Sequence, residues 1–314
     1  MRFNPKARID TGRVRDSGRS GGMGGGLGGS PMRIPMPSGK AGGGIGGVIL
    51  LVLIFVLLQC SGLGGGGGTT TSNGGSLDTS RVSDGTDRYA ECKTGDDANK
   101  SADCARVAVE NSMTDFWADE LGSKFQPEAA LVTFTGQTQT GCGGATSQVG
   151  PFYCPSDQTI YLDTTFFRDV LQQQLGGPAG DFVEPYVLAH EYGHHIQNLL
   201  GTMNRVRTQQ GPRSDAVRLE LQADCYAGMW TKNATSTTDS GGEALITELS
   251  QDDIQTAIAA AKSVGDDRIQ QQMQGRVSPE SWTHGSAESR MKWFSVGYDQ
   301  GSLQACDTWA VDTP

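Results

Sequence analysis

The stretch Val187-Leu-Ala-His-Glu-Tyr-Gly-His-His-Ile196 decides the fold, because it lies within an apolar pattern that predicts a helix over residues 183–200. Residues four apart on a helix share one face, so His190 and His194 can direct ring nitrogens at a single metal ion. Glu191 points about 100° away from His190 around the helix axis and can take a proton from a water beside that ion. The H-E-x-x-H spacing therefore predicts a zinc site that activates water.

The histidine content of the chain is low and concentrated in this stretch. Of four His, three lie within six residues: His190, His194 and His195. The alternative interpretation is a helix with surface histidines and an unrelated Glu. His195 points about 100° away from His194, which predicts that it packs in the core or supports the site from outside.

A zinc ion that activates water needs a third protein ligand and leaves a fourth position open. No third His follows at the H-E-x-x-H-x-x-G-x-x-H spacing. Glu220 and Asp224 instead lie four residues apart on a predicted helix over residues 214–232. If this helix packs antiparallel to the first, Glu220 is the third ligand, and Asp224 accepts the free N–H of a ligand His.

Two alternatives remain for these carboxylates. Both could belong to a solvated acidic helix face. Asp224 could also be the metal ligand itself, since Asp224-Cys-Tyr-Ala-Gly228 is faintly similar to the D-x-x-Y-G pattern of aspzincins.

The rest of the domain shows a few short strand patterns followed by many helical ones. Further helices are predicted over residues 102–121, 165–175, 250–264, 266–273 and 286–298, and strands over residues 129–135 and 159–163. This order predicts an α+β fold that is mostly helical with a small sheet. The strand at 159–163 could offer its edge to an extended substrate, or it could be a core strand.

The beginning of the chain differs in composition from the remainder. The chain has 314 residues, and 23 of its 45 Gly lie in the first 75 positions. We predict a disordered basic arm over residues 1–40, a transmembrane helix over 41–60, a Gly-rich linker over 61–80 and the folded domain over 81–314. The uncharged stretch Ala41–Leu58 would give about 27 Å of helix, close to the hydrocarbon thickness of a bilayer.

A cleaved signal peptide and a lipoprotein linkage are the alternatives to a retained span. No small-x-small cleavage site follows Leu58, which disfavours a signal peptide. Gln59 stands before Cys60 where a lipoprotein would have a small residue. The retained single-pass anchor is therefore the preferred prediction.

The predicted arm and the predicted domain differ in the sign of their net charge. Residues 1–40 carry eight Lys or Arg against two Asp, although the formal charge of the whole chain is −10. An excess of Lys and Arg before the span predicts a cytoplasmic N-terminus and a domain outside the cell membrane. The acidic domain would repel phosphate backbones, so no nucleic-acid partner is expected.

Six cysteines follow the predicted span, and none forms the C-x-x-C pair of a zinc knuckle. An even number outside the cytoplasm favours disulfides. Pairing neighbours along the chain predicts the bonds Cys92–Cys104, Cys142–Cys154 and Cys225–Cys306. The alternative is buried free thiols.

Several of these features occur together in one known family. The basic arm, single span, Gly-rich tether, H-E-Y-G-H-H segment, E-L-Q-A-D-C helix and H-G-S segment resemble the neutral zinc metallopeptidase family of bacterial membrane proteins. The spacing of Glu220 and Asp224 is similar to that of gluzincins. The resemblance implies a zincin-like helical core beside a small sheet, bound Zn²⁺ and peptide-bond hydrolysis. It implies no particular substrate.

The last histidine carries a further resemblance. Thr283-His284-Gly-Ser286, followed by Arg290, is similar to the H-P-S-x-x-x-R stretch of membrane-linked gluzincins, with Gly in place of Pro. By this resemblance His284, together with Arg290, would stabilise the oxyanion of a tetrahedral intermediate. The alternative is a helix-entry histidine that packs on Trp282 or Trp293.

Three functions follow from the sequence. The leading one is a membrane-anchored zinc metallopeptidase that acts on a peptide or protein, with Glu191 as general base. The second is a zinc-binding pseudoenzyme that serves as an envelope binding or scaffold module. The third is an interaction domain without metal. The enzyme is favoured, because a scaffold need not keep Glu191 between His190 and His194.

Overall fold

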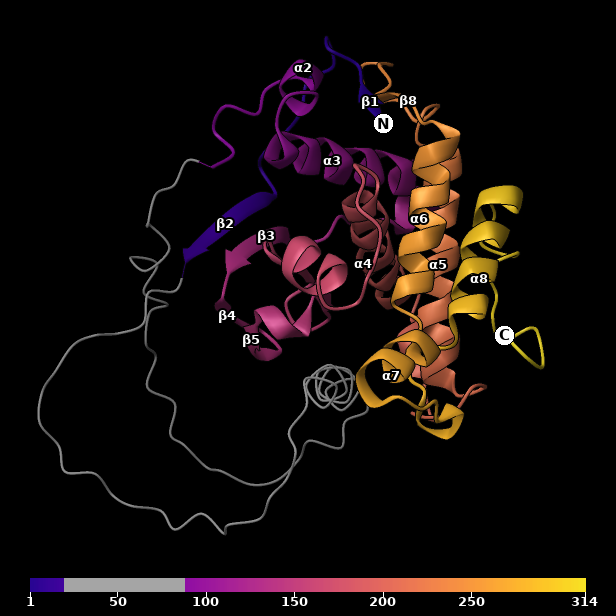
Figure 1. Cartoon of the computed structure of the whole chain (residues 1–314). Coiled ribbons are helices and arrows are strands. Elements are labelled where there is room, and N and C mark those ends of the chain that lie inside the picture. Colours follow the sequence, from indigo (N-terminus) through magenta and orange to yellow (C-terminus); the bar gives the residue numbers. More distant parts are fainter. Residues whose placement is uncertain (20–87) are drawn as a thin grey trace, which may run out of the picture.

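A small sheet lies beside a bundle of helices in the computed structural model, which describes residues 1–19 and 88–314 (Figure 1). The strand order is β2–β3–β7–β6. In this sheet β2 (Val14–Arg19), β3 (Ala130–Thr135) and β7 (Thr159–Asp163) are parallel, and β6 (Phe152–Cys154) is antiparallel at the edge. The long helices are α3 (Ala102–Leu121), α4 (Val183–Leu199), α5 (Asp215–Asn233), α6 (Gln251–Ser263) and α8 (Ala287–Gln300). The predicted α+β fold is confirmed.

Most predicted element boundaries agree with the structure to within two residues. Shorter elements are α2 (Gly95–Ala98), α7 (Asp266–Gln274), β1 (Arg2–Phe3), β4 (Gln137–Thr140), β5 (Gly143–Thr146) and β8 (Ile246–Glu248). The helix predicted over residues 165–175 is a shorter π-helix, Phe167–Gln172. The β4–β5 hairpin was not predicted, because these Gly- and Thr-rich strands lack an alternating apolar pattern.

The strand at 159–163 does not form an edge of the sheet. It is β7, and it lies between β3 and β6 with all five of its residues buried. The core-strand alternative is therefore correct, and the proposal that this strand offers its edge to a substrate is wrong. The edge strand on this side is β6.

Residues 1–19 are part of the folded domain. The strand β1 pairs antiparallel with β8, and β2 pairs in parallel with β3 at the edge of the sheet (Figure 1). The Arg13 guanidinium also lies 2.9 Å from the buried carboxylate of Glu110 on α3. The prediction of a disordered arm over residues 1–40 is therefore wrong for this segment. Its basic composition is typical of disorder, and the partner of the strand lies far along the chain.

This pairing also bears on the predicted membrane topology. The predicted span at 41–60 lies outside the described residues, as does the linker at 61–80. Among residues 1–19 and 88–314, no helix combines the length and apolar character needed to cross a membrane. The predicted orientation, with a cytoplasmic N-terminus and the domain outside the membrane, stays a prediction.

Three disulfides fix loops and helix ends to the core. They join Cys92 to Cys104, Cys142 to Cys154 and Cys225 to Cys306, as predicted. All six cysteines are buried. The bond from Cys225 on α5 to Cys306 spans 81 residues and holds the C-terminal segment against the helix that carries Glu220.

Helices α5 and α8 approach each other very closely through two glycines. A Cβ atom on Gly228 would lie 2.1 Å from the carbonyl oxygen of Phe294, and one on Gly297 would lie 1.9 Å from that of Cys225. Only glycine allows the two helix backbones to approach this closely. This contact positions α8 and brings its residue Arg290 toward α4 and α5.

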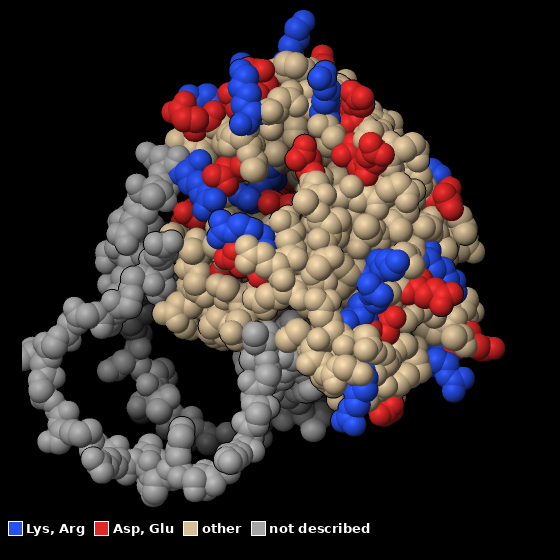
Figure 2. Space-filling model, viewed as in Figure 1, with Lys and Arg blue, Asp and Glu red and all other residues tan. Residues whose placement is uncertain are grey.

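Charged side chains are mixed on the face of the molecule that Figure 2 shows. Lys and Arg there lie interspersed with Asp and Glu, above all around the upper part of the molecule, where α2 and α3 lie. This face carries no large patch of a single charge sign.

Candidate metal centre

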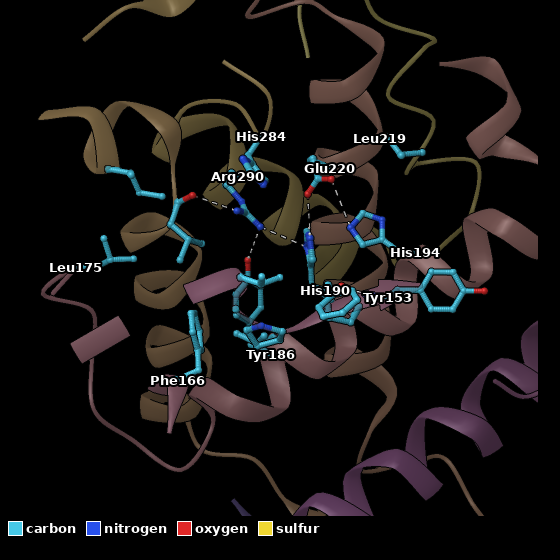
Figure 3. Close-up of a pocket in the computed structure, with 18 of the residues that line it drawn as sticks. Tyr153, Phe166, Leu175, Tyr186, His190, His194, Leu219, Glu220, His284 and Arg290 are labelled. Carbon is cyan, nitrogen blue, oxygen red and sulfur yellow. Dashed lines mark hydrogen bonds and ion pairs between the residues drawn. The ribbon is translucent and has the colours of Figure 1, made fainter. Parts of the chain in front are cut away.

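Three buried side chains from two helices converge on one point. His190 and His194 come from α4, and Glu220 comes from α5 (Figure 3). His190 Nε2 lies 3.2 Å from one Glu220 oxygen, and His194 Nε2 lies 3.5 Å from the other. The three possible ligand atoms lie within 4.8 Å of one another. The sequence prediction of Glu220 as the partner of both histidines agrees with this arrangement.

The donor set fits a zinc ion. Two imidazole nitrogens and one carboxylate are a common ligand set of catalytic zinc, with bonds of about 2.0–2.2 Å. Such bonds place neighbouring ligands of a tetrahedral ion about 3.4 Å apart, close to the two distances from Glu220 to the histidines. Burial raises the pKa of Glu220, but His194 and His190 outweigh it, so this pKa lies well below its usual value. The carboxylate is therefore ionised and ready to bind a cation.

A glycine lets the two helices come close enough to share a metal ion. Gly193 of α4 faces Ala223 of α5, and a Cβ atom at Gly193 would lie only 3.1 Å from the Ala223 backbone. Ser214 begins α5 by accepting a hydrogen bond from the backbone N–H of Val217. The small side chains at Gly193 and Ala223 therefore allow the close approach of α4 and α5 that determines the spacing of the three possible ligands.

Both histidines are held with Nε2 toward Glu220. His190 Nδ1 donates to Asp224 Oδ1 at 2.8 Å, and His194 Nδ1 donates to Gln197 Oε1 at 2.8 Å. These bonds fix the tautomer and leave each Nε2 lone pair free for a metal ion. Burial lowers the pKa of His190, but the Asp224 carboxylate raises it to about 10 on balance, so a metal ion that binds Nε2 would displace a proton from it. The predicted role of Asp224 agrees with this geometry, whereas Asp224 is not among the converging ligands.

Asp224 is itself held by two residues that do not bind the metal. The Tyr186 hydroxyl donates to Asp224 Oδ1 at 2.6 Å, and Arg290 donates from Nε and Nη2 at 2.8 and 2.9 Å. Burial raises the pKa of Asp224, but Arg290 and His190 hold it well below its usual range. The sequence prediction that Arg290 helps to stabilise an oxyanion is not supported, since its bonds to Asp224 and to the Val264 carbonyl occupy the guanidinium.

Glu191 is fixed beside the metal centre by a strand. The backbone N–H of Tyr153 in β6 donates to Glu191 Oε2 at 3.0 Å. Burial raises the pKa of Glu191, while His194 and His190 oppose that rise. A carboxylate with a raised pKa is suited to accept and return a proton near neutral pH.

His284 lines the same cavity as the metal ligands. Its ring Nδ1 lies 3.3 Å from Asp266 Oδ1, and Asp266 Oδ2 also accepts the backbone N–H groups of Thr283, His284 and Gly285. These bonds hold His284 beside Glu220 and Arg290 (Figure 3). The alternative, a histidine that only packs at a helix entry, does not account for its place in the cavity.

His195 lies outside the metal centre. Its Nε2 donates to the Gln126 carbonyl at 2.8 Å, and its Nδ1 accepts from the Tyr153 hydroxyl at 3.1 Å. Burial lowers its pKa. The prediction of an outer supporting residue therefore agrees with the structure, and the residue it supports is the one that binds Glu191.

Comparison with known proteins identifies the family of the chain. The family described as "Putative neutral zinc metallopeptidase" matches residues 1–309. The chain belongs to this family. An uncharacterized protein of Mycobacterium tuberculosis is 51% identical over 238 residues, which cover 75% of this chain and 80% of that protein. The uncharacterized protein YpfJ of Escherichia coli K12 is 43% identical over 199 residues, 61% of this chain and 64% of YpfJ. No solved structure matches the chain.

Family membership agrees with the resemblance seen in the sequence, but several supporting residues had no sequence signal. Tyr186, Gln197 and Asp266 each contact a residue of the site, yet none stands in a motif that the sequence analysis used. Gln197 lies three residues after His194 on α4, so helical spacing could have placed it there. The Tyr153 contact depends on a strand that the sequence analysis did not predict.

Proposed function

We propose that the protein is a zinc-dependent metallopeptidase that hydrolyses peptide bonds. The observation that carries this proposal is the position of Glu191. It lies on the same helix as His190 and His194, buried, with its carboxylate held by the Tyr153 backbone toward the centre that these histidines share with Glu220. A purely structural metal site needs no such carboxylate outside the ligand set.

The residues divide the chemistry among them. His190, His194 and Glu220 would hold Zn²⁺, which when bound polarises the substrate carbonyl and lowers the pKa of the attacking water. Glu191 accepts a proton from that water and passes it to the leaving amine. His284, held by Asp266, donates a hydrogen bond to the oxyanion that develops on the carbonyl oxygen.

Metal analysis and a peptide library test this function with a single matched variant. The purified full chain should contain about one zinc per molecule and cleave peptides from an unbiased library. Glu191→Gln keeps the size of the side chain and removes the base, so it should retain zinc and lose about 100- to 10,000-fold in turnover.

Each other outcome has a definite meaning. Bound zinc without cleavage by the unaltered protein would support a zinc-binding scaffold instead of an enzyme. Equal cleavage by Glu191→Gln would remove the proposed general base. A protein that binds no zinc would contradict the metal centre itself.

A further inference from the structure

The metal centre opens into a cavity of about 170 Å³ whose far wall is apolar. This volume is several times the roughly 30 Å³ that one water occupies in the liquid. The wall is formed by Phe152, Phe166, Leu175, Val187, Val264 and Ile269. In Figure 3 the side chains of Phe166 and Leu175 lie together on one side of the view, and His190 and His194 lie on the other side. The apolar wall is therefore next to the possible metal ligands.

The charged residues on the described lining of this cavity each have a polar partner in the protein. Of the charged residues there, Glu191 accepts the Tyr153 N–H, Glu220 faces both histidines, and Arg290 is bonded to Asp224. A charged substrate side chain that entered would lose its hydration without gaining a partner. An apolar side chain would instead gain the free energy of leaving water.

We propose that this cavity holds a large apolar side chain next to the scissile bond, so the substrates are peptides with residues such as Leu or Phe at that position. This inference rests on the proposed peptidase function. Its specificity comes from Leu175 after the π-helix, Val264 after α6 and Ile269 on α7, which lie outside both metal motifs. Burial of such a side chain favours Leu over Asp by about 10- to 100-fold in affinity or kcat/KM.

Two readouts test the cavity separately from catalysis. Peptides that differ only by Leu or Asp on either side of the cleaved bond are compared as substrates of the unaltered protein. The same peptides are titrated into Glu191→Gln by fluorescence anisotropy. Ile269→Asp places a charge on the partly exposed part of the wall and should remove the Leu preference, while Ile269→Val should keep it.

The outcomes distinguish the two claims. Cleavage without preference, or equal binding of both peptides, overturns the apolar cavity and leaves the peptidase intact. Preferred binding of the Leu peptide without any cleavage supports the cavity and overturns hydrolysis. An unchanged preference in Ile269→Asp would mean that this wall does not select the substrate.

A second inference comes from the N-terminal segment and does not depend on catalysis. Residues 1–19 contribute two strands to the domain, and Asn111 of α3 bonds both the N–H and the carbonyl of Asp10. Arg13 adds its ion pair to Glu110, whose side chain is fully buried. These contacts come from β8, β3 and α3 and involve residues from Arg2 to Arg19, so the segment is held along most of its length.

We infer that residues 1–19 and residues 88–314 lie on the same side of any membrane that the chain contacts. Strand pairing and a buried ion pair require both partners in one aqueous compartment. A single crossing between them would leave Glu110 without the Arg13 cation and β3 without its partner β2.

Accessibility of single cysteines tests this topology in the full-length chain. Lys6→Cys and Lys262→Cys are each made in a Cys60→Ser background, since both lysines are exposed and Cys60 lies outside the predicted disulfides. Spheroplasts that produce each variant are treated with a membrane-impermeant maleimide before and after lysis. Both sites should label under the same condition. Labelling of one site before lysis and the other only afterwards would overturn the inference.

Discussion

Helices α4 and α5, which carry the possible metal ligands, and the N-terminal segment 1–19 are both held by buried charged residues. The two regions differ in how far apart the interacting residues lie in the sequence. His190 and its partner Glu220 lie 30 residues apart on two consecutive helices. Arg13 and Glu110 lie 97 residues apart, and Arg2 of β1 lies 246 residues from its neighbour Glu248 in β8. The difference shows that a site built on regular helical spacing can be predicted from the sequence. Pairing between strands that lie far apart in the chain leaves no local pattern to predict it from.

The largest effect is expected for the third metal ligand. Glu220→Gln should lower zinc affinity by more than about 100-fold, since even partners outside the ligand set are worth about 10- to 100-fold. Competition with a chelator measures this affinity, and Glu288→Gln on the exposed side of α8 is the control. An unchanged affinity would transfer the ligand role to Asp224.

A smaller effect is expected for the residue that orients His190. Asp224→Asn keeps the shape of the side chain but weakens its bonds to His190 and Arg290, so zinc affinity should fall by about 10- to 100-fold. The same titration measures it, with thermal unfolding alongside. If Asp224→Asn bound zinc as tightly as Glu288→Gln, the carboxylate would serve the fold and not the metal.

The N-terminal segment should affect stability without affecting the metal. Arg13→Gln removes a cation from the fully buried Glu110 and should lower the free energy of unfolding by about 2 kcal/mol. Zinc affinity should stay unchanged. Arg8→Gln is the control, because that side chain is exposed and makes no described ion pair. A drop in zinc affinity would show that the segment and the metal helices act as one unit.

The smallest effect concerns pH. Glu128 is fully buried, and burial together with Glu110 raises its pKa well above 4.5, although the Arg13 guanidinium lies 3.8 Å from its carboxylate. The folded protein therefore binds more protons than the unfolded chain, and the free energy of unfolding falls as pH rises from about 4.5 through that raised pKa. Glu128→Gln should flatten this decline in urea titrations at several pH values. A curve parallel to that of the unaltered protein would mean that Glu128 is ionised in the fold.

The metal centre was largely predictable because its spacing is fixed by helix geometry. The four-residue interval places His190 above His194 and Glu220 above Asp224, and the remaining question was only whether the two helices pack together. Family resemblance then supplied the role of His284. The supports of these residues were not predictable, since Asp266 reaches the site from the start of α7 and Tyr153 from a three-residue strand.

The sheet was predictable only in part. The strands β3 and β7 carry the apolar, β-branched residues of buried strands, and both were found in the sequence. The strand β2, Val-Arg-Asp-Ser-Gly-Arg, is mostly polar because it lies at the edge, where one side faces solvent. Its Arg and Gly content is typical of a flexible tail, so composition alone pointed to disorder.

The pairing of β1 with β8 also determines the order in which the molecule can be completed during synthesis. Arg2 leaves the ribosome well before its neighbour Glu248, which emerges only after α4 and α5 have been made. Contacts between such distant residues close a long loop and therefore form late. The nascent chain must keep β1 unpaired until then, which exposes this segment to misassembly and chaperone binding.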